Sequence, residues 1–303
     1  MRELRDACAS VAAQARFVAI EAEAIPAYAE TLRLSDPAGA SDGQAMSTAP
    51  REQRAAFWIQ LDAVNFGSGW FPTLRKPAGR SGYQTIAGAL REHAERHGPW
   101  TAQQLTRLNA STIAAVLDQD PDHELMALFA QSLRDLGARV GAEHGGSFTA
   151  TVDAAGGSAV ALALALGKWD CFADCSRYRE LTVPFLKRAQ IAAADLARAG
   201  VATFADLGEL TMFADNLVPH VLRLDGILRF APALVGRIDR GELIEHGSPE
   251  EVEIRACALH AVELIVAARP GATAAQVDEL LWTRGQQPRY KASPRHRSRS
   301  TAY

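Results

Sequence analysis

The chain has 303 residues, 48% of them hydrophobic and 22% charged, and a formal net charge of −3. That length holds one large domain or two ordinary ones, and the composition is that of a globular protein, not of a disordered or fibrous one. The acidic balance argues against general affinity for nucleic acid, although it leaves room for a local basic patch.

The first residues, the apolar segments and the cysteines bear on where the protein works. Charged residues stand among the first alanines, so the chain shows no signal-peptide core, and the most apolar run, Ala159–Leu166, is too short for a bilayer. We therefore expect a cytoplasmic protein without membrane contact. Four cysteines in a chain of this size, Cys8, Cys171, Cys175 and Cys257, are expected to be reduced thiols. No metal site is expected, because no histidine pair at ligand spacing accompanies Cys171 and Cys175.

In the first half of the chain, apolar periodicity and capping residues predict short helices. The Ala-rich start predicts a helix up to Pro26, and Gly, Pro, Ser and Asp predict a loop at 34–52, either a mobile lid or a linker. Further helices are expected over Arg54–Val64, from Ser81 to His97, from Ala102, and over Asn109–Leu117 and Asp122–Leu136. Between them, the aromatic and Gly-rich segment 65–70 either stacks on a planar ligand or fills a core.

A Lys-Arg pair marks the first turn of the helix expected over Pro184–Ala199. The helix dipole mildly disfavours cations at this end, so Lys187 and Arg188 suggest an anionic partner. A solvated helix face is the commoner explanation for such a pair.

The segment Leu210–Arg223 reads LTMFADNLVPHVLR, and the rest of the chain is interpreted around it. Because Pro219 suits a first helical turn, Asp215 or Asn216 should lie at the N-cap of a helix that runs through Leu224. No Lys or Arg stands nearby in the sequence, and Phe213 is two residues away. A carboxylate beside an aromatic ring suits a flat ligand with a developing positive charge, but a plain Asp cap gives the same pattern.

The last third of the chain predicts three more helices, Pro232–Gly241, Glu250–Ala268 and one started by a Thr273 capping box. On the last of them Asp278 interrupts an apolar face, which is costly for a carboxylate without a partner. Glu279 points elsewhere on the helix and is a weaker site candidate. The tail 284–303 is basic, and its tyrosines suggest that it packs back on the body, where Arg295 or Arg297 could pair with Asp278.

Almost every segment favours helix and none alternates long enough for a strand, so we predict one all-α domain over residues 1–303. The segment TMFADNLVPHVLR resembles the TMFADxRxPQxL signature of the queuosine salvage family, the queuosine 5′-phosphate N-glycosylase/hydrolases. Six further segments resemble that family's motifs in the same order: LDAVNFGSGW (61–70), SGYQTIAGAL (81–90), GGSF (145–148), FLKRAQI (185–191), EEVEIRACALHAVELI (250–265) and PRYKASPRHRSRSTAY (288–303).

The resemblance implies a fold similar to the helical DNA glycosylases, without the LPGxG hairpin with which those enzymes hold a DNA backbone. It implies hydrolysis of queuosine 5′-monophosphate to queuine and ribose 5-phosphate, with no cofactor and no stable nucleic-acid complex. Asp215 would act near the ribose as stabiliser or base, and Phe213 would stack on the ring.

The same resemblance gives Asp278 the role of a carboxylate that contacts queuine. The monophosphate substrate that it implies makes Lys187 and Arg188, at their helix start, candidates for contact with the 5′-phosphate. The family's second Asp, five residues after Asp278, is Thr283 here, so its role is in question. Two alternatives stay open: a base glycosylase that acts on nucleic acid, and a non-catalytic binder of a modified base.

Overall fold

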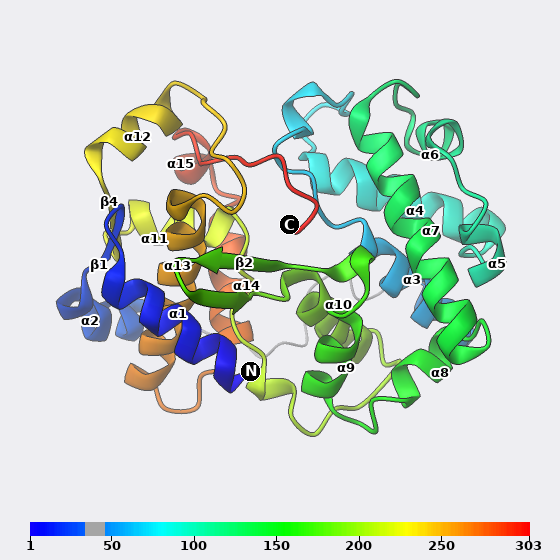
Figure 1. The fold of residues 1–303 in the computed structure, drawn as a ribbon, viewed down its shortest axis with the longest axis horizontal. Helices are drawn as coiled ribbons and strands as arrows, with labels where there is room; N and C mark the ends of the chain where they lie inside the picture. Colours follow the sequence, from blue (N-terminus) through cyan, green and yellow to red (C-terminus); the bar gives the residue numbers. More distant parts are fainter. Residues whose placement is uncertain (34–45) are drawn as a thin grey trace. The chain divides into compact units, whose positions relative to one another are not determined.

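The computed structural model describes residues 1–33 and 46–303, and most of them are helical (Figure 1). The prediction of a mainly helical protein is therefore confirmed. By its internal contacts the chain forms two units. Among the described residues, the first comprises 1–33, Asp174–Lys187 and Gly208–Ser300, and the second comprises 46–173, Arg188–Leu207 and Thr301–Tyr303. Two units can belong to one domain, so the single domain stays a prediction.

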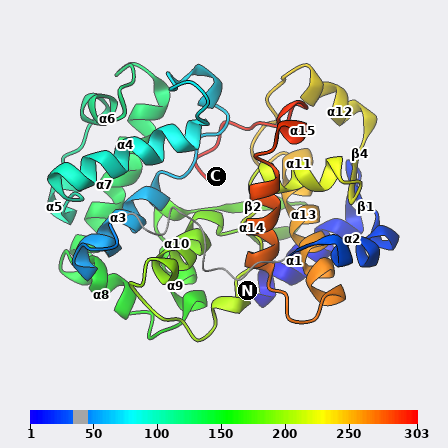
Figure 2. The same ribbon diagram turned by 180° about the vertical axis from the view of Figure 1, so that it is seen from behind.

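The first unit is built around helix α13 (Pro249–Ala268), which is buried along most of its length (Figure 2). It packs against four helices: α1 (Arg2–Gln14), α2 (Ile25–Thr31), α11 (Leu217–Leu224) and α14 (Ala274–Arg284). Helices α12 (Pro232–Asp239) and α15 (Pro288–Lys291) complete the unit. The capping box predicted at Thr273 is present and fixes the start of α14.

Two small antiparallel pairs of strands, which the sequence did not predict, also belong to this unit. Strand β1 (Val18–Ile20) pairs with β4 (Leu228–Phe230), and β2 (Cys175–Tyr178) pairs with β3 (Leu181–Pro184). The helix predicted up to Pro26 is therefore confirmed over Arg2–Gln14 and wrong beyond it. Buried Glu253 accepts hydrogen bonds from the backbone N–H groups of Arg16, Phe17 and Val18, which holds this segment extended, and Pro26 lies in the first turn of α2.

The second unit consists of helices and the loops that connect them. They are α3 (Arg51–Ala63), α4 (Gly82–His97), α5 (Ala102–Leu105), α6 (Ala110–Leu117), α7 (Glu124–His144), α8 (Phe148–Asp153), α9 (Ala159–Leu166) and α10 (Lys187–Arg198) without its first residue. Ser81 and Thr101 each form a capping box, at the starts of α4 and α5. Short 3-10 helices lie at Ala22–Ala24, Phe71–Thr73, Asp170–Phe172 and Leu207–Glu209.

Two further predictions for this part of the chain have a structural outcome. Of the loop expected at 34–52, residues 34–45 lie outside the described residues, and α3 already begins at Arg51. The aromatic segment 65–70 fills a core, because Phe66 and Trp70 are buried and Phe66 packs edge-on against Phe129. Within the described parts of the chain, no helix has the length and hydropathy needed to cross a bilayer.

Candidate functional site

Asp215 lies at the start of α11, as the sequence predicted. One oxygen of its carboxylate, Oδ1, accepts hydrogen bonds from the backbone N–H groups of Leu217, at 2.8 Å, and Val218, at 3.2 Å. These are amides of the first helical turn, which have no partner inside a helix, so the negative charge sits at the positive end of the helix dipole. Among the described residues no group donates to Oδ2, and the side chain is only partly buried. This oxygen is therefore available to a ligand.

Asp278 projects from α14 and is 6% exposed. Its Oδ1 accepts the backbone N–H of Phe213 at 3.1 Å, which ties α14 to the loop that carries Asp215. Burial raises the pKa of Asp278 well above its ordinary value, and the charge of Asp215 raises this pKa further. The backbone hydrogen bond and the charge of Lys187 oppose that shift. The fold thus places Asp215, Phe213 and Lys187, all in the first unit, close enough to Asp278 to influence its pKa.

A cation near Asp215 comes from the C-terminal tail, not from the neighbouring sequence. Burial lowers the pKa of the Arg295 guanidinium, and the negative charge of Asp215 opposes this shift. The tail stays in place here because His296 accepts a hydrogen bond through its carbonyl from the side-chain amide of Asn216, at 3.3 Å. The suggested pairing of Asp278 with Arg295 or Arg297 is absent, since none of the described residues forms an ion pair with Asp278.

The remaining two candidates differ in position. Glu279, next to Asp278, is partly exposed, and its charge adds to the factors that raise the pKa of Asp278. Arg188 belongs to the second unit and is 1% exposed. Its guanidinium donates hydrogen bonds to the backbone carbonyls of Ala63, Cys171 and Ala302. These bonds give Arg188 a structural task, and its contact with a phosphate stays a prediction.

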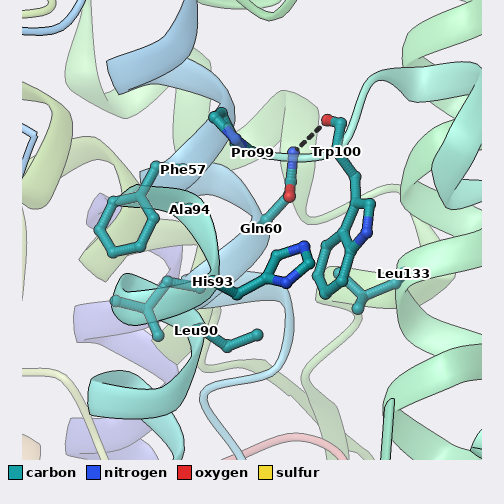
Figure 3. A pocket seen from close by; sticks show the side chains of 9 residues that line it. Phe57, Gln60, Leu90, His93, Ala94, Pro99, Trp100 and Leu133 are labelled. Carbon is teal, nitrogen blue, oxygen red and sulfur yellow. Dashed lines mark hydrogen bonds between the residues drawn. The ribbon is translucent and has the colours of Figure 1, made fainter. Parts of the chain in front are cut away.

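A separate pocket in the second unit lacks the groups for acid–base chemistry by carboxylates. Figure 3 shows it between α3 and α4, with the ring of His93 beside that of Trp100, 4.5 Å between centroids. Gln60 donates to the carbonyl of Trp100 at 2.7 Å and so closes one side. The described residues also contain no cluster of three or more His, Cys, Asp or Glu side chains that could hold a metal ion. The carboxylates of α11 and α14 are therefore the better candidate site.

The chemistry of these two carboxylates indicates a class of enzyme. The carboxylate of Asp215 accepts two backbone N–H groups at a helix start, whereas burial and the charge of Asp215 raise the pKa of Asp278 and so favour its protonated form. Two carboxyl groups with different surroundings, one of them with a raised pKa, are typical of enzymes that hydrolyse glycosidic bonds. Comparison with known proteins agrees with this class: residues 45–303 match the model of the family described as queuosine salvage protein. The chain belongs to this family.

Individual relatives match different shares of the chain. A protein from Sphaerobacter thermophilus named queuosine 5′-phosphate N-glycosylase/hydrolase is 40% identical over 266 residues, which are 84% of this chain and 82% of that protein. The protein of the same name from Bos taurus is 29% identical over 69% of this chain and 62% of its own length. The one from Mus musculus is 36% identical over 41% of this chain and 38% of its own length.

Asp278→Asn should make the protein more stable. Because the pKa of Asp278 is raised in the folded chain, stability falls as the pH rises from the pKa of the unfolded carboxyl through that of the folded one. Asparagine keeps an oxygen for the N–H of Phe213 but cannot ionise. We expect its melting temperature to exceed that of the wild type by at least ~2 °C at neutral pH, which corresponds to about 1 kcal/mol.

The pH dependence distinguishes this cause from better packing. The gain in melting temperature should shrink toward zero in acid, where Asp278 is protonated in both the folded and the unfolded chain. Melting curves of both proteins at several pH values measure it. A gain that is equal at all pH values would contradict the argument from ionisation.

Proposed function

We propose that this chain hydrolyses the N-glycosidic bond of queuosine 5′-monophosphate and releases queuine and ribose 5-phosphate. The observation that carries the proposal is the amide-bound carboxylate of Asp215 beside the buried carboxyl of Asp278. Membership of the queuosine salvage family supports it, and so do the names of the relatives. The product queuine serves tRNA modification, and we place the reaction in the cytoplasm.

In the proposed reaction the bond between the ribose carbon and the glycosidic nitrogen breaks, and its electron pair leaves with the base. The ribose carbon gains oxocarbenium character, which the ionised Asp215 stabilises from its available Oδ2. A water oxygen then bonds to this carbon and gives up one proton, for which Asp215 can act as base. The departing base takes up one proton, so one water molecule is consumed in total.

Release of the base needs protein contacts that take the place of protonation at N7, which helps an ordinary purine to leave. Queuine is a 7-deazaguanine and has carbon in place of N7, so protonation at that nitrogen cannot help it to leave. Asp278 would accept the N1–H and 2-amino donors of the guanine-like edge, a geometry that suits a carboxylate. Phe213, which is partly exposed next to Asp215, would stack on the ring. Glu279 remains a weaker candidate for the same edge.

The direct experiment is to incubate the purified protein with queuosine 5′-monophosphate and to measure free queuine. Multiple-turnover release supports the proposal, and its absence overturns it. A non-catalytic binder would retain queuosine without cleaving it. A base glycosylase for nucleic acid, which the basic tail 284–303 would serve, would bind DNA or RNA with an affinity that falls steeply as salt increases.

Lys187→Gln should impair turnover of the nucleotide more than that of the dephosphorylated nucleoside. Lys187 is the first residue of α10, and its charge reaches Asp278, so an ammonium ion stands close to the carboxylates. A point charge that binds the 5′-phosphate contributes only when the phosphate is present. We expect kcat/KM for the nucleotide to fall by about 10–100-fold, and that for the nucleoside to change little.

Arg188→Gln serves as a comparison for the neighbouring cation. If Arg188 also binds the phosphate, its replacement should be selective for the nucleotide in the same way. If its bonds to the carbonyls of Ala63, Cys171 and Ala302 are its whole task, the melting temperature should fall and both substrates should be affected equally. Kinetics on both substrates with each variant separate these cases, and equal loss in Lys187→Gln would exclude its phosphate contact.

A further inference from the structure

Arg255 is a fully buried cation at the centre of the first unit, and the proposed chemistry does not use it. It lies on α13, is 0% exposed, and its guanidinium lies over the ring of Phe185 at 3.9 Å from the centroid. Its partners are two equally buried carboxylates, Asp174 at 2.7 Å and Glu251 at 3.6 Å. In the sequence, Arg255 stands four residues after Glu251, and this helical spacing alone would explain it as the partner of Glu251.

One arm of the guanidinium reaches the loop that carries Asp215. The Nε of Arg255 donates to the backbone carbonyl of Ala214 at 2.9 Å. Ala214 stands between Phe213, whose N–H binds Asp278, and Asp215, whose carboxylate binds the first amides of α11. Since the carbonyl of Ala214 is fixed by Arg255, the peptide units on both sides of it have little freedom to rotate. This arm therefore fixes the backbone from which the Asp215 side chain projects.

The other arm reaches the turn that carries Lys187. The Nη2 of Arg255 donates to Oδ2 of Asp174, and the same oxygen accepts the backbone N–H of Lys187 at 2.9 Å. Just before it, Leu186 has a φ of 54°, a left-handed conformation that is unfavourable for a branched residue. Its N–H donates to the backbone carbonyl of Asp174 at 3.3 Å. Asp174, held by Arg255, thus keeps a strained turn in place at the start of α10.

We infer that Arg255 is a positioning residue for the proposed hydrolysis: one planar guanidinium fixes the Asp215 loop and the Lys187 turn together. The inference rests on the proposed function. A guanidinium suits this task because its N–H groups diverge in one rigid plane and it remains charged when buried. A lysine at the same position keeps the charge, but its single ammonium cannot reproduce two diverging hydrogen bonds with the same geometry.

Arg255→Lys tests the inference. We expect kcat for queuosine 5′-monophosphate to fall by about 10²-fold per folded molecule, because a small displacement of a reacting group costs a factor of that size. The preference for nucleotide over nucleoside should also weaken, since the Lys187 turn loosens. Asp174→Asn changes the partner of the second arm, so it should weaken binding of the nucleotide more than that of the nucleoside.

Glu253→Gln is the matched control. Glu253 lies on the same helix two residues before Arg255, is also 0% exposed, and accepts hydrogen bonds from the backbone of residues 16–18 and from the hydroxyl of Tyr178. None of these contacts involves the site, so this variant should lose stability and keep kcat.

Wild-type protein is assayed beside the variants. No queuine from wild type would overturn the proposed function itself. If the wild type is active and Arg255→Lys has an unchanged kcat, only the positioning role is overturned. The same holds if kcat falls equally in Arg255→Lys and in Glu253→Gln. If Arg255→Lys does not fold, the test falls to Asp174→Asn. The positioning role is then overturned if this variant binds nucleotide and nucleoside with equal losses.

Discussion

Asp215→Asn should lower the release of queuine by at least ~10²-fold while the protein stays folded. The expected size is that of removing one electrostatic stabiliser from a transition state. Asparagine retains an oxygen that can accept the N–H groups of Leu217 and Val218, and it caps helices almost as well as aspartate. The substitution therefore removes the charge at Oδ2, which would face the ribose, and leaves the start of α11 intact.

Asp225→Asn provides the control, because Asp225 stands at the other end of the same helix. Its carboxylate accepts hydrogen bonds from Tyr28, Arg284, Arg289 and Tyr290, which places it in a structural network. Loss of its charge should lower the melting temperature and leave kcat per folded molecule unchanged. Steady-state kinetics and melting curves of both variants make the comparison. Near-normal turnover by Asp215→Asn would reduce Asp215 to a plain helix cap.

Local sequence signals predicted the elements that depend on neighbouring residues. The start of α11 follows from Asp215 and Pro219, and the starts of α4 and α14 follow from Ser81 and Thr273 with their capping boxes. The strands were missed because each has only three or four residues and pairs with a segment that periodicity does not reveal. For β1 the decisive contact is Glu253, more than 230 positions along the chain.

In the candidate site, too, contacts between residues far apart in the sequence could not be predicted. The sequence singled out Asp215, and it singled out Asp278 as a carboxylate on an apolar face, but it could not predict that the N–H of Phe213 would join them. Nor could it place Arg295 near Asp215, since only the fold brings the tail to this loop. The role of Arg255 could not be predicted for another reason. Its spacing from Glu251 already explained the residue, whereas its hydrogen bonds to Ala214 and Asp174 depend on tertiary packing.

The choice of base should depend on Asp278. A site built to accept hydrogen bonds from a guanine-like edge rejects a base that lacks those donors, often by ~10⁴-fold, because the buried group is left without partners. Adenine-type bases offer a different pattern at this edge. We therefore expect adenosine monophosphate to be cleaved at no more than ~10⁻⁴ of the rate for queuosine 5′-monophosphate. A comparable rate for the two nucleotides would exclude recognition by Asp278.

Free queuine should bind to the wild type and not to Asp278→Ala, and its binding should release a proton. Burial and Asp215 favour protonated Asp278 in the free protein, whereas acceptance of two N–H donors favours the carboxylate. Affinity should therefore rise with pH until Asp278 is ionised in the free protein, and then level off. Calorimetric titration in two buffers of different ionisation enthalpy measures the released proton, and melting curves report the folded fraction. Unchanged affinity per folded molecule in Asp278→Ala, with only a shift in melting temperature, would make Asp278 a structural residue and leave recognition of the base to other groups.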